Sequence, residues 1–242
     1  MVAIARAEIR RNVESVRERI ASAAARSRRK PEDVTLIGVS KFQPVEAMYA
    51  ALDCGIAIFG ENRVQERAEK AALWKGGEAV WHMIGHLQRN KARRALELFN
   101  CIQSVDGFEL ASALERIISG RSGSEPVISA PYPVFIEVNT SGEGSKSGVQ
   151  PEGCIALAER IVRDCRSLRI DGFMAIGPLS EEEGETRASF AILRSLAEET
   201  RTRTGIEAPH LSMGMSGDFE TAIEEGATIV RVGTDIFGAR HP

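Results

Sequence analysis

The sequence of 242 residues lacks a strong net charge and a long apolar run, and its first residues lack the pattern of a signal peptide. Its 31 Lys and Arg residues and 34 Asp and Glu residues give a net charge of −3, which argues against a basic surface for nucleic acid. No segment approaches the ~18 uncharged apolar residues of a membrane span, and residues 1–19 contain no continuous apolar stretch of the kind that a signal peptide needs. We therefore expect a cytoplasmic protein that binds neither nucleic acid nor membrane.

Regular cysteine spacing is also missing. The four cysteines, at positions 54, 101, 154 and 165, form no C-x-x-C pair and are typical of buried free thiols in a reducing compartment. With 43% hydrophobic and 27% charged residues, the composition is that of a globular protein. Length leaves one or two domains open, although α/β barrels commonly reach ~250 residues in one domain.

An amphipathic helix is expected before the first strand. From Val2 to Arg29, apolar residues recur at helical spacing among Arg and Glu, as in a helix with one buried face. The basic cluster at positions 26–30 and the following Pro31 suit the end of that helix, because cations stabilise its C-terminus.

Apolar runs that alternate with helical patterns make up the rest of the chain. The candidate strands are Val34 to Ser40, Ile56 to Gly60, Val80 to Gly85, Cys101 to Val105, Val134 to Asn139, Ile170 to Ile176, His210 to Met215 and Thr228 to Gly233. The helical segments between them are Val45 to Asp53, Val64 to Trp74, Lys91 to Phe99, Glu109 to Ile118, Cys154 to Asp164, Glu185 to Thr202 and Phe219 to Glu225.

Eight apolar strands that alternate with helices predict an α/β protein with one (β/α)₈ (TIM) barrel. We expect a single domain over residues 1–242, with an extra N-terminal helix in residues 1–30 and the barrel in residues 34–240. Gly120 to Pro133 is interpreted as a long loop before strand five. An open doubly wound sheet is the alternative, but no G-x-G-x-x-G follows the first strand, where GVSKFQP stands.

Lys41 follows the first predicted strand, and the strand itself carries no charge. In a barrel of this type the functional residues come from the C-terminal ends of the strands. A lysine there can extend to the surface. In a partly apolar barrel mouth, however, desolvation lowers the pKa of the ammonium group, and the neutral amine attacks aldehydes. Lys41 is therefore a candidate for Schiff-base formation.

The segments after strands seven and eight are rich in glycine and hydroxyl groups. The chain leaves strand seven through Ser216 and Gly217 before a helix, and Gly233 and Thr234 end strand eight. Phosphate sites in this fold are often built from these two loops, where backbone amides and a helix N-terminus act together. The sequence therefore predicts a phosphate site.

Arg231 interrupts the uncharged run of strand eight. A buried arginine keeps its charge and needs acceptors, so one interpretation is an ion pair with Glu137 of strand five or Asp171 near strand six. Closure of the barrel would place strand eight beside strand one and bring Arg231 towards Lys41. A ligand with an aldehyde, a ring nitrogen and a phosphate would engage the lysine, the arginine and the phosphate site. Pyridoxal 5′-phosphate (PLP), the vitamin B6 aldehyde, has all three.

Six strings occur in order between Val34 and Arg240: GVSKFQP, FGENRVQE, WHMIGHLQRNK, GSKSG, LSMGMSGDFETAIEEG and VRVGTDIFGAR. Together they resemble the pyridoxal phosphate homeostasis protein family. The resemblance implies a fold-type III PLP-binding barrel, similar to the N-terminal domain of alanine racemase. It also implies PLP held as a Schiff base on Lys41, with Arg231 donating to the pyridine nitrogen.

The same resemblance implies further cofactor-binding residues. Ser216, Gly233 and Thr234 would hold the phosphate. Asn62, in GENRVQE after strand two, would lie close to the cofactor, and Met213 after strand seven would help to wall it.

Binding PLP does not by itself predict catalysis. Arginine has donors but no acceptors, so a pyridine nitrogen facing Arg231 stays unprotonated, which weakens the ring as an electron sink. A racemase also needs a second base, which alanine racemase takes as a tyrosine from another domain. The tyrosines here are Tyr49, in the first barrel helix, and Tyr132, in the loop before strand five, and we expect no further domain after Pro242.

We therefore expect a monomeric carrier in PLP homeostasis, without a catalytic residue, that releases PLP to apo-enzymes. A one-domain PLP-dependent racemase is the alternative, and a scaffold that binds a protein partner and uses PLP as a signal stays open.

Two further patterns suggest sites that we do not predict. His82 and His86 are four residues apart, but no third ligand in a recognisable motif accompanies them, so we expect no metal; His86 is expected at the barrel mouth. Lys146 in GEGSKSG does not complete a P-loop, because Ser145 stands where glycine is needed. The family resemblance puts Lys146 in a loop near the mouth.

Overall fold

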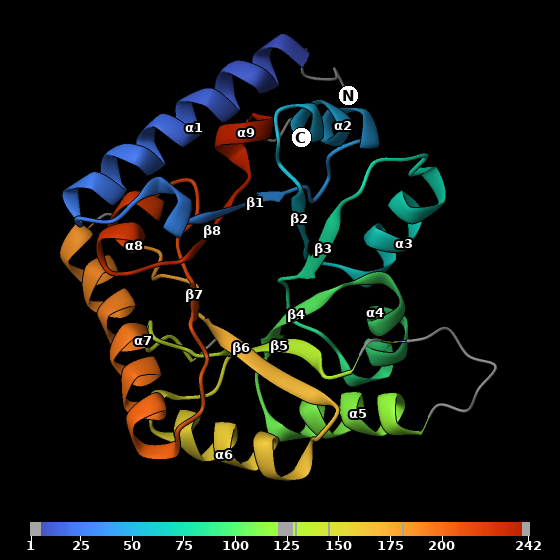
Figure 1. The fold of residues 1–242 in the computed structure, drawn as a ribbon, viewed down its shortest axis with the longest axis vertical. Helices are drawn as coiled ribbons and strands as arrows, with labels where there is room; N and C mark the ends of the chain where they lie inside the picture. Colours follow the sequence, from blue (N-terminus) through green and yellow to red (C-terminus); the bar gives the residue numbers. More distant parts are fainter. Residues whose placement is uncertain (1–5, 121–127, 129, 145, 181, 239–242) are drawn as a thin grey trace.

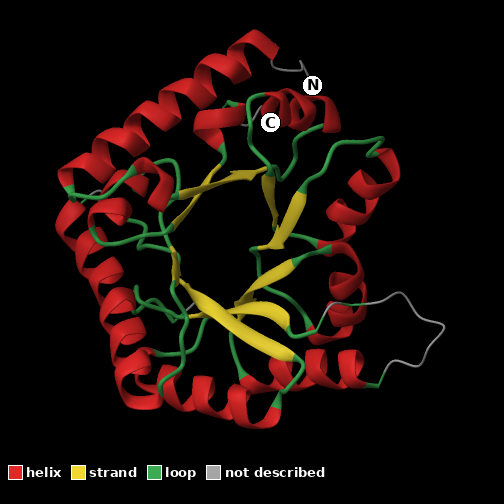
Figure 2. Ribbon diagram, viewed as in Figure 1, coloured by secondary structure: helices red, strands yellow, loops and turns green. Residues whose placement is uncertain are grey.

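The computed structural model describes residues 6–120, 128, 130–144, 146–180 and 182–238. In these residues, parallel strands form a closed barrel in the order β1-β2-β3-β4-β5-β6-β7-β8, and Figure 1 and Figure 2 show the helices as a ring around it. The strands are β1 (Thr35–Val39), β2 (Ile58–Glu61), β3 (Val80–Met83), β4 (Cys101–Val105), β5 (Tyr132–Glu137), β6 (Leu168–Met174), β7 (His210–Ser212) and β8 (Ile229–Val232).

The α-helices of the described residues follow the strands in turn, apart from the first. They are α1 (Arg6–Arg26), α2 (Val45–Asp53), α3 (Val64–Leu73), α4 (Ala92–Leu98), α5 (Phe108–Ser119), α6 (Cys154–Asp164), α7 (Glu183–Thr204), α8 (Phe219–Glu224) and α9 (Thr234–Phe237). Short 3-10 turns lie at Pro31–Asp33, Arg89–Lys91 and Pro151–Gly153.

Pairing of the first strand with the last decides between the barrel and the open sheet. β1 pairs with β8 in parallel, with Leu36 opposite Val230 and Gly38 opposite Val232. The strands are short apolar runs because both of their faces are covered, one by the barrel interior and the other by helices. The predicted (β/α)₈ barrel is confirmed, and the open doubly wound sheet is excluded.

The start of β5 differs from the prediction. Tyr132, predicted in a loop, is the first residue of the strand, is 3% exposed, and donates its hydroxyl to the carbonyl of Phe99 at 2.7 Å. Its backbone N–H donates to Ser167, which precedes β6. Aromatic residues fit a half-buried strand well, so Tyr132 extends β5 although Pro133 follows it.

Parts of three predicted segments lie outside the described residues. These are the beginning of the N-terminal helix before Arg6, most of the loop between residues 120 and 130, and the predicted end of the barrel after residue 238.

Helix α1 lies along the outside of the barrel against α8, α9 and α2, as Figure 1 shows. The basic cluster at its end contacts α8: Arg26 pairs with Glu224 at 2.7 Å, and Arg29 donates to the carbonyls of Ile223 and Ala227. Arg29 therefore also satisfies carbonyl groups at the C-terminal end of a neighbouring helix.

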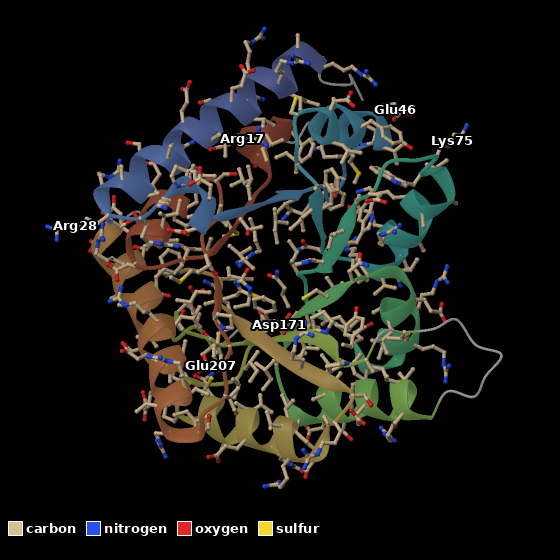
Figure 3. The ribbon with its side chains drawn as sticks, viewed as in Figure 1. Arg17, Arg28, Glu46, Lys75, Asp171 and Glu207 are labelled. Carbon is tan, nitrogen blue, oxygen red and sulfur yellow. The ribbon has the colours of Figure 1, made fainter. Side chains whose placement is uncertain are left out.

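Side chains fill the interior of the ring in Figure 3, where Asp171 on β6 lies inside it and Arg28 and Lys75 lie at the outer edge. No helix among the described residues combines the length and the apolar character needed to cross a membrane.

Candidate functional site

A cavity of about 230 Å³ lies at the C-terminal ends of the strands. Its lining residues come from β1 and β8 and from the segments after β1, β2, β3, β6, β7 and β8. They are Val39, Lys41, Gln43, Asn62, Ile84, Ile176, Met215, Ser216, Gly217, Arg231, Gly233, Thr234 and Gly238. Lys41, Asn62, Ser216, Arg231, Gly233 and Thr234, all predicted from the sequence, thus line one cavity.

Met213 does not line this cavity. The structure places its side chain in the buried core, and Met215 lines the cavity instead. The backbone N–H of Met213 still donates to Ile229 of β8, so this residue continues the sheet pairing of β7. Gly214 then turns the chain with a φ of +93°, and only the residues after the turn reach the cavity.

The turn that carries Lys41 is held on both sides by buried charges. Phe42 has a φ of +64°, in the left-handed region that non-glycine residues rarely adopt. The backbone N–H of Phe42 donates to the carboxylate of Glu66, and Lys70 Nζ donates to the carbonyl of Ser40 at 2.6 Å. Lys70 also pairs with Glu66 at 2.8 Å, so one ion pair fixes both neighbours of Lys41.

Glu61, the last residue of β2, completes this group. Its carboxylate accepts hydrogen bonds from Lys70 Nζ at 2.5 Å and from Ser40 Oγ at 2.7 Å. Burial raises the pKa of Glu61, although the Lys70 charge acts in the opposite direction. This network was not predicted from the sequence. Its detectable signals are a charged residue that ends a strand and an i,i+4 pair of Glu66 and Lys70 on the next helix.

Arg231 is anchored by a chain of hydrogen bonds across the barrel interior. Its guanidinium donates to Ser212 Oγ at 2.7 Å and to the carbonyl of Ala175 at 2.9 Å. Ser212 Oγ donates in turn to Gln103 Oε1 at 2.7 Å, and Gln103 Nε2 donates to His82 Nδ1 at 2.7 Å. The orientation of the guanidinium is therefore set by residues of four other strands and strand ends.

Arg231 keeps its charge although it is 3% exposed. Burial lowers its pKa to about 10, while Asp218 and Glu137 raise it, so the group stays protonated at neutral pH. Within the described part of the chain, no carboxylate lies within 4 Å of it, and Asp171 pairs with Arg169 instead. The alternative interpretation of Arg231, as an ion-pair partner of Asp171 or Glu137, is therefore wrong; Glu137 acts on Arg231 only from a longer distance.

The other end of the cavity presents hydroxyl groups and glycine backbone. Ser216 Oγ accepts a hydrogen bond from the backbone N–H of Asp235 at 3.3 Å, which ties the segment after β7 to α9. A Cβ atom at Gly217 would meet no atom within 4 Å, so this glycine leaves its backbone open to a ligand. This combination of small residues and donors suits an anionic oxygen group.

A second cavity of about 300 Å³ adjoins the first and shares Asn62, Ile84 and Ile176 with it. His86 and Lys146 line this cavity, so both lie at the barrel mouth. His86 Nδ1 lies 3.0 Å from Asp106, while Lys146 Nζ pairs with Glu143 at 2.7 Å and donates to the carbonyl of Gly177 at 2.8 Å. No group of three potential metal ligands occurs among the residues that the structure describes.

Comparison with known proteins first defines the class. The family model of the alanine racemase N-terminal domain matches residues 4–241, so the chain is an alanine racemase-like barrel.

Individual relatives then define the family. A pyridoxal phosphate homeostasis protein of Aquifex aeolicus is 40% identical over 225 residues, which cover 93% of this chain and 95% of that protein. The protein of the same name from Pseudomonas aeruginosa is 42% identical over 232 residues, or 96% of each chain. PipY of Synechococcus elongatus PCC7942, solved with PLP bound, is 38% identical with a TM-score of 0.75, covering 90% of this chain and 100% of PipY. The chain belongs to the pyridoxal phosphate homeostasis protein family.

Proposed function

We propose that this chain is a monomeric, single-domain PLP carrier of the cytoplasm, which holds PLP as a Schiff base on Lys41 and releases it to apo-enzymes without turnover. The observation that carries the proposal is that Lys41, Arg231 and the residues Ser216, Gly233 and Thr234 line one cavity. The relatives named for PLP homeostasis and the PLP-bound PipY structure support it.

The side chains around the cavity match the three functional groups of PLP, namely its aldehyde, its ring nitrogen and its phosphate. Lys41 supplies a primary amine for the aldehyde, and Arg231 supplies a charged donor for the ring nitrogen. Ser216, Gly233 and Thr234 supply hydroxyls and backbone for the phosphate. Asn62 lines the same cavity, and we retain it as a cofactor contact. Met213 lies in the core behind the cavity, whereas Met215 lines the cavity directly.

Binding and release are two directions of one reaction. When bound, PLP would supply an aldehyde carbon for a C=N bond to Lys41 Nζ, with loss of water. Addition of water to that bond would return the free aldehyde and the lysine amine, so no oxidant or reductant would be required.

Two features of the site support a carrier rather than a racemase. Burial lowers the pKa of Arg231 only to about 10, so the guanidinium stays charged; it would donate to the ring nitrogen of PLP and keep that nitrogen unprotonated. The two tyrosines have other partners: Tyr49 accepts a hydrogen bond from the backbone of Lys75, and Tyr132 donates to Phe99. Neither lies among the residues that line the cavity.

Absorbance spectroscopy tests the proposal. Wild-type protein mixed with PLP is expected to show an imine band near the visible edge, and Lys41→Ala is expected to lose it. Lys75→Ala, at an exposed position, is the matched control and should keep the band. Absence of the band in wild-type protein, or borohydride trapping of PLP on another lysine, would contradict the assignment.

Transfer and turnover are measured separately. The PLP-loaded protein should activate an added PLP-dependent apo-enzyme. In a separate assay without the apo-enzyme, the loaded protein should not exchange the α-proton of added amino acids with solvent at a catalytic rate. Proton exchange at a catalytic rate would favour the racemase. Analytical ultracentrifugation measures the oligomeric state, which we expect to be monomeric.

A further inference from the structure

Two residues that line the second cavity each carry a buried oxygen atom without a hydrogen-bond partner among the described residues. Glu137 Oε2 and Asn62 Oδ1 are both buried and unpaired among the described residues, and both residues line this cavity. Glu137, the last residue of β5, is 4% exposed. Since an unpaired buried acceptor costs about 1–3 kcal/mol, and more when it is charged, this arrangement is suited to a ligand that donates hydrogen bonds.

The charged neighbours of Glu137 do not supply those donors. Asp106 raises the pKa of Glu137 and Arg231 lowers it, both by charge at a distance. At the rim, Lys146 is paired with Glu143, and His86 lies against Asp106. A small cation that enters the cavity could therefore satisfy Glu137 without displacing an existing ion pair.

The walls indicate which cation fits. Apolar side chains, Ile84, Val138 and Ile176, line the cavity beside the two acceptors. A primary ammonium group on an alkyl chain has three N–H donors for the oxygens and a hydrocarbon stem for the apolar wall. We propose that the second cavity binds a primary ammonium group, with the carboxylate of Glu137 and the amide oxygen of Asn62 as its acceptors.

In the proposed carrier, an amine bound in the second cavity would be able to receive PLP from Lys41. This role rests on the proposed function. Because burial raises the pKa of Glu137 to about 7, its carboxylate can take one proton from the bound ammonium group. With PLP bound, exchange of amines would form a bond from the incoming nitrogen to the former aldehyde carbon and would break the bond from that carbon to Lys41 Nζ. The protons lost by the incoming nitrogen would pass to the departing lysine nitrogen, one of them through Glu137, so atoms, charge and electrons balance without an oxidant or reductant.

Binding of butylammonium to the cofactor-free protein tests the site directly. Calorimetry should show saturable binding to wild-type protein and at least about tenfold weaker binding to Glu137→Gln, because a hydrogen bond to a charged group is lost. Glu46→Gln, at an exposed position on α2, is the matched control and should bind as wild type does. Wild-type affinity should fall below about pH 7, where Glu137 becomes protonated. Equal affinity in wild type and Glu137→Gln would overturn the proposal.

Tetramethylammonium provides a test that needs no variant. It has the same charge as a primary ammonium group but no N–H donor, so it should not raise the unfolding midpoint of wild-type protein as butylammonium does. Equal stabilisation by the two cations would show a general charge effect and reject the site. This comparison still decides the matter if Glu137→Gln fails to fold.

Two probes distinguish the sources of the amine. L-Alanine represents a free amino acid, and Nα-acetyl-lysine methylamide represents a lysine side chain of a protein; binding of either supports the site and identifies its source. Because these measurements use cofactor-free protein, they are independent of Schiff-base formation. Amine binding without an imine band would refute the carrier function alone, whereas an imine band without amine binding would refute this site alone.

Discussion

At the scale of single residues, the position of Lys41 depends on a buried lysine that does not face the cofactor cavity. Lys70 Nζ contacts Ser40, Glu61 and Glu66 and is almost fully buried. Removing one partner of a buried ion pair leaves an uncompensated charge, which commonly costs about 3–5 kcal/mol. Here the same loss would also release the left-handed turn at Phe42, so Lys70 is a positioning residue for Lys41.

We expect Lys70→Met to weaken PLP binding about tenfold and to lower stability by about 3 kcal/mol. Titration of the imine band measures the first effect, and chemical unfolding measures the second. Lys70→Arg should restore part of the affinity because it retains the charge, and Lys75→Met, at an exposed site, should leave both quantities unchanged. A Lys70→Met protein that loses stability but keeps its PLP affinity and the pH profile of the imine band would reduce Lys70 to a structural role. If Lys70→Met does not fold, Glu66→Gln tests the same turn through Phe42.

At the scale of elements, helix α1 supports the segments that surround the phosphate end of the cavity. Arg19 donates to Glu220 of α8 at 2.5 Å and to Asp235 of α9 at 2.6 Å, and it lies 4.4 Å from the ring centre of Phe219. The backbone of Asp235 is bonded to Ser216. One side chain of the N-terminal helix thus connects the two loops that follow β7 and β8.

Arg19→Met is expected to weaken PLP binding about threefold and to destabilise the protein by about 1 kcal/mol, since partly exposed ion pairs contribute little individually. Phosphate-dependent binding should change most, so the affinity for PLP should fall more than the affinity for pyridoxal. Arg11→Met, on the exposed face of the same helix, serves as the control. An equal loss of affinity for both aldehydes would show that α1 does not act through the phosphate end.

At the scale of the whole molecule, stability depends on polar groups inside the closed barrel. The chain of hydrogen bonds from Arg231 through Ser212 and Gln103 to His82 links β8, β7, β4 and β3. Burial lowers the pKa of His82 to about 4, so the ring is neutral in the folded protein at neutral pH. The unfolded chain, by contrast, takes up this proton below its ordinary pKa of about 6.5.

Wild-type protein should therefore lose stability relative to His82→Gln as the pH falls from about 6.5 to 4. In this range the unfolded state binds one more proton at His82 than the folded state does, so the free energy of unfolding decreases with falling pH. The relative loss is at most about 3 kcal/mol, and water around the half-buried ring reduces it. Urea unfolding of both proteins at several pH values measures the difference. A constant difference between pH 7 and 4 would contradict a neutral His82 in the folded state.

The sequence predicted the barrel and most of the cavity because both depend on local patterns. Alternating apolar runs and helical periods determine the order of the elements, and strand ends in such a barrel meet at one mouth. Lys41, Arg231, Ser216 and Thr234 could therefore be assigned to one site from their positions at strand ends. Met213 was expected to wall the cavity, but it lies in the core, and Met215, which was not considered from the sequence, lines the cavity; the direction of each side chain depends on the turn at Gly214.

The linear sequence by itself determined the number and order of the strands, the family and the residues at the strand ends, since these follow from apolar periodicity and contiguous motifs. Only the tertiary structure decided which partners the buried charged groups have: Lys70 contacts Glu61 and Glu66, and Arg231 donates to Ser212. It also showed that Glu137 Oε2 has no partner among the described residues. Such contacts join different strands and helices, and their energies depend on burial and on distances of a few ångströms. Neither quantity can be read from the order of the residues along the chain.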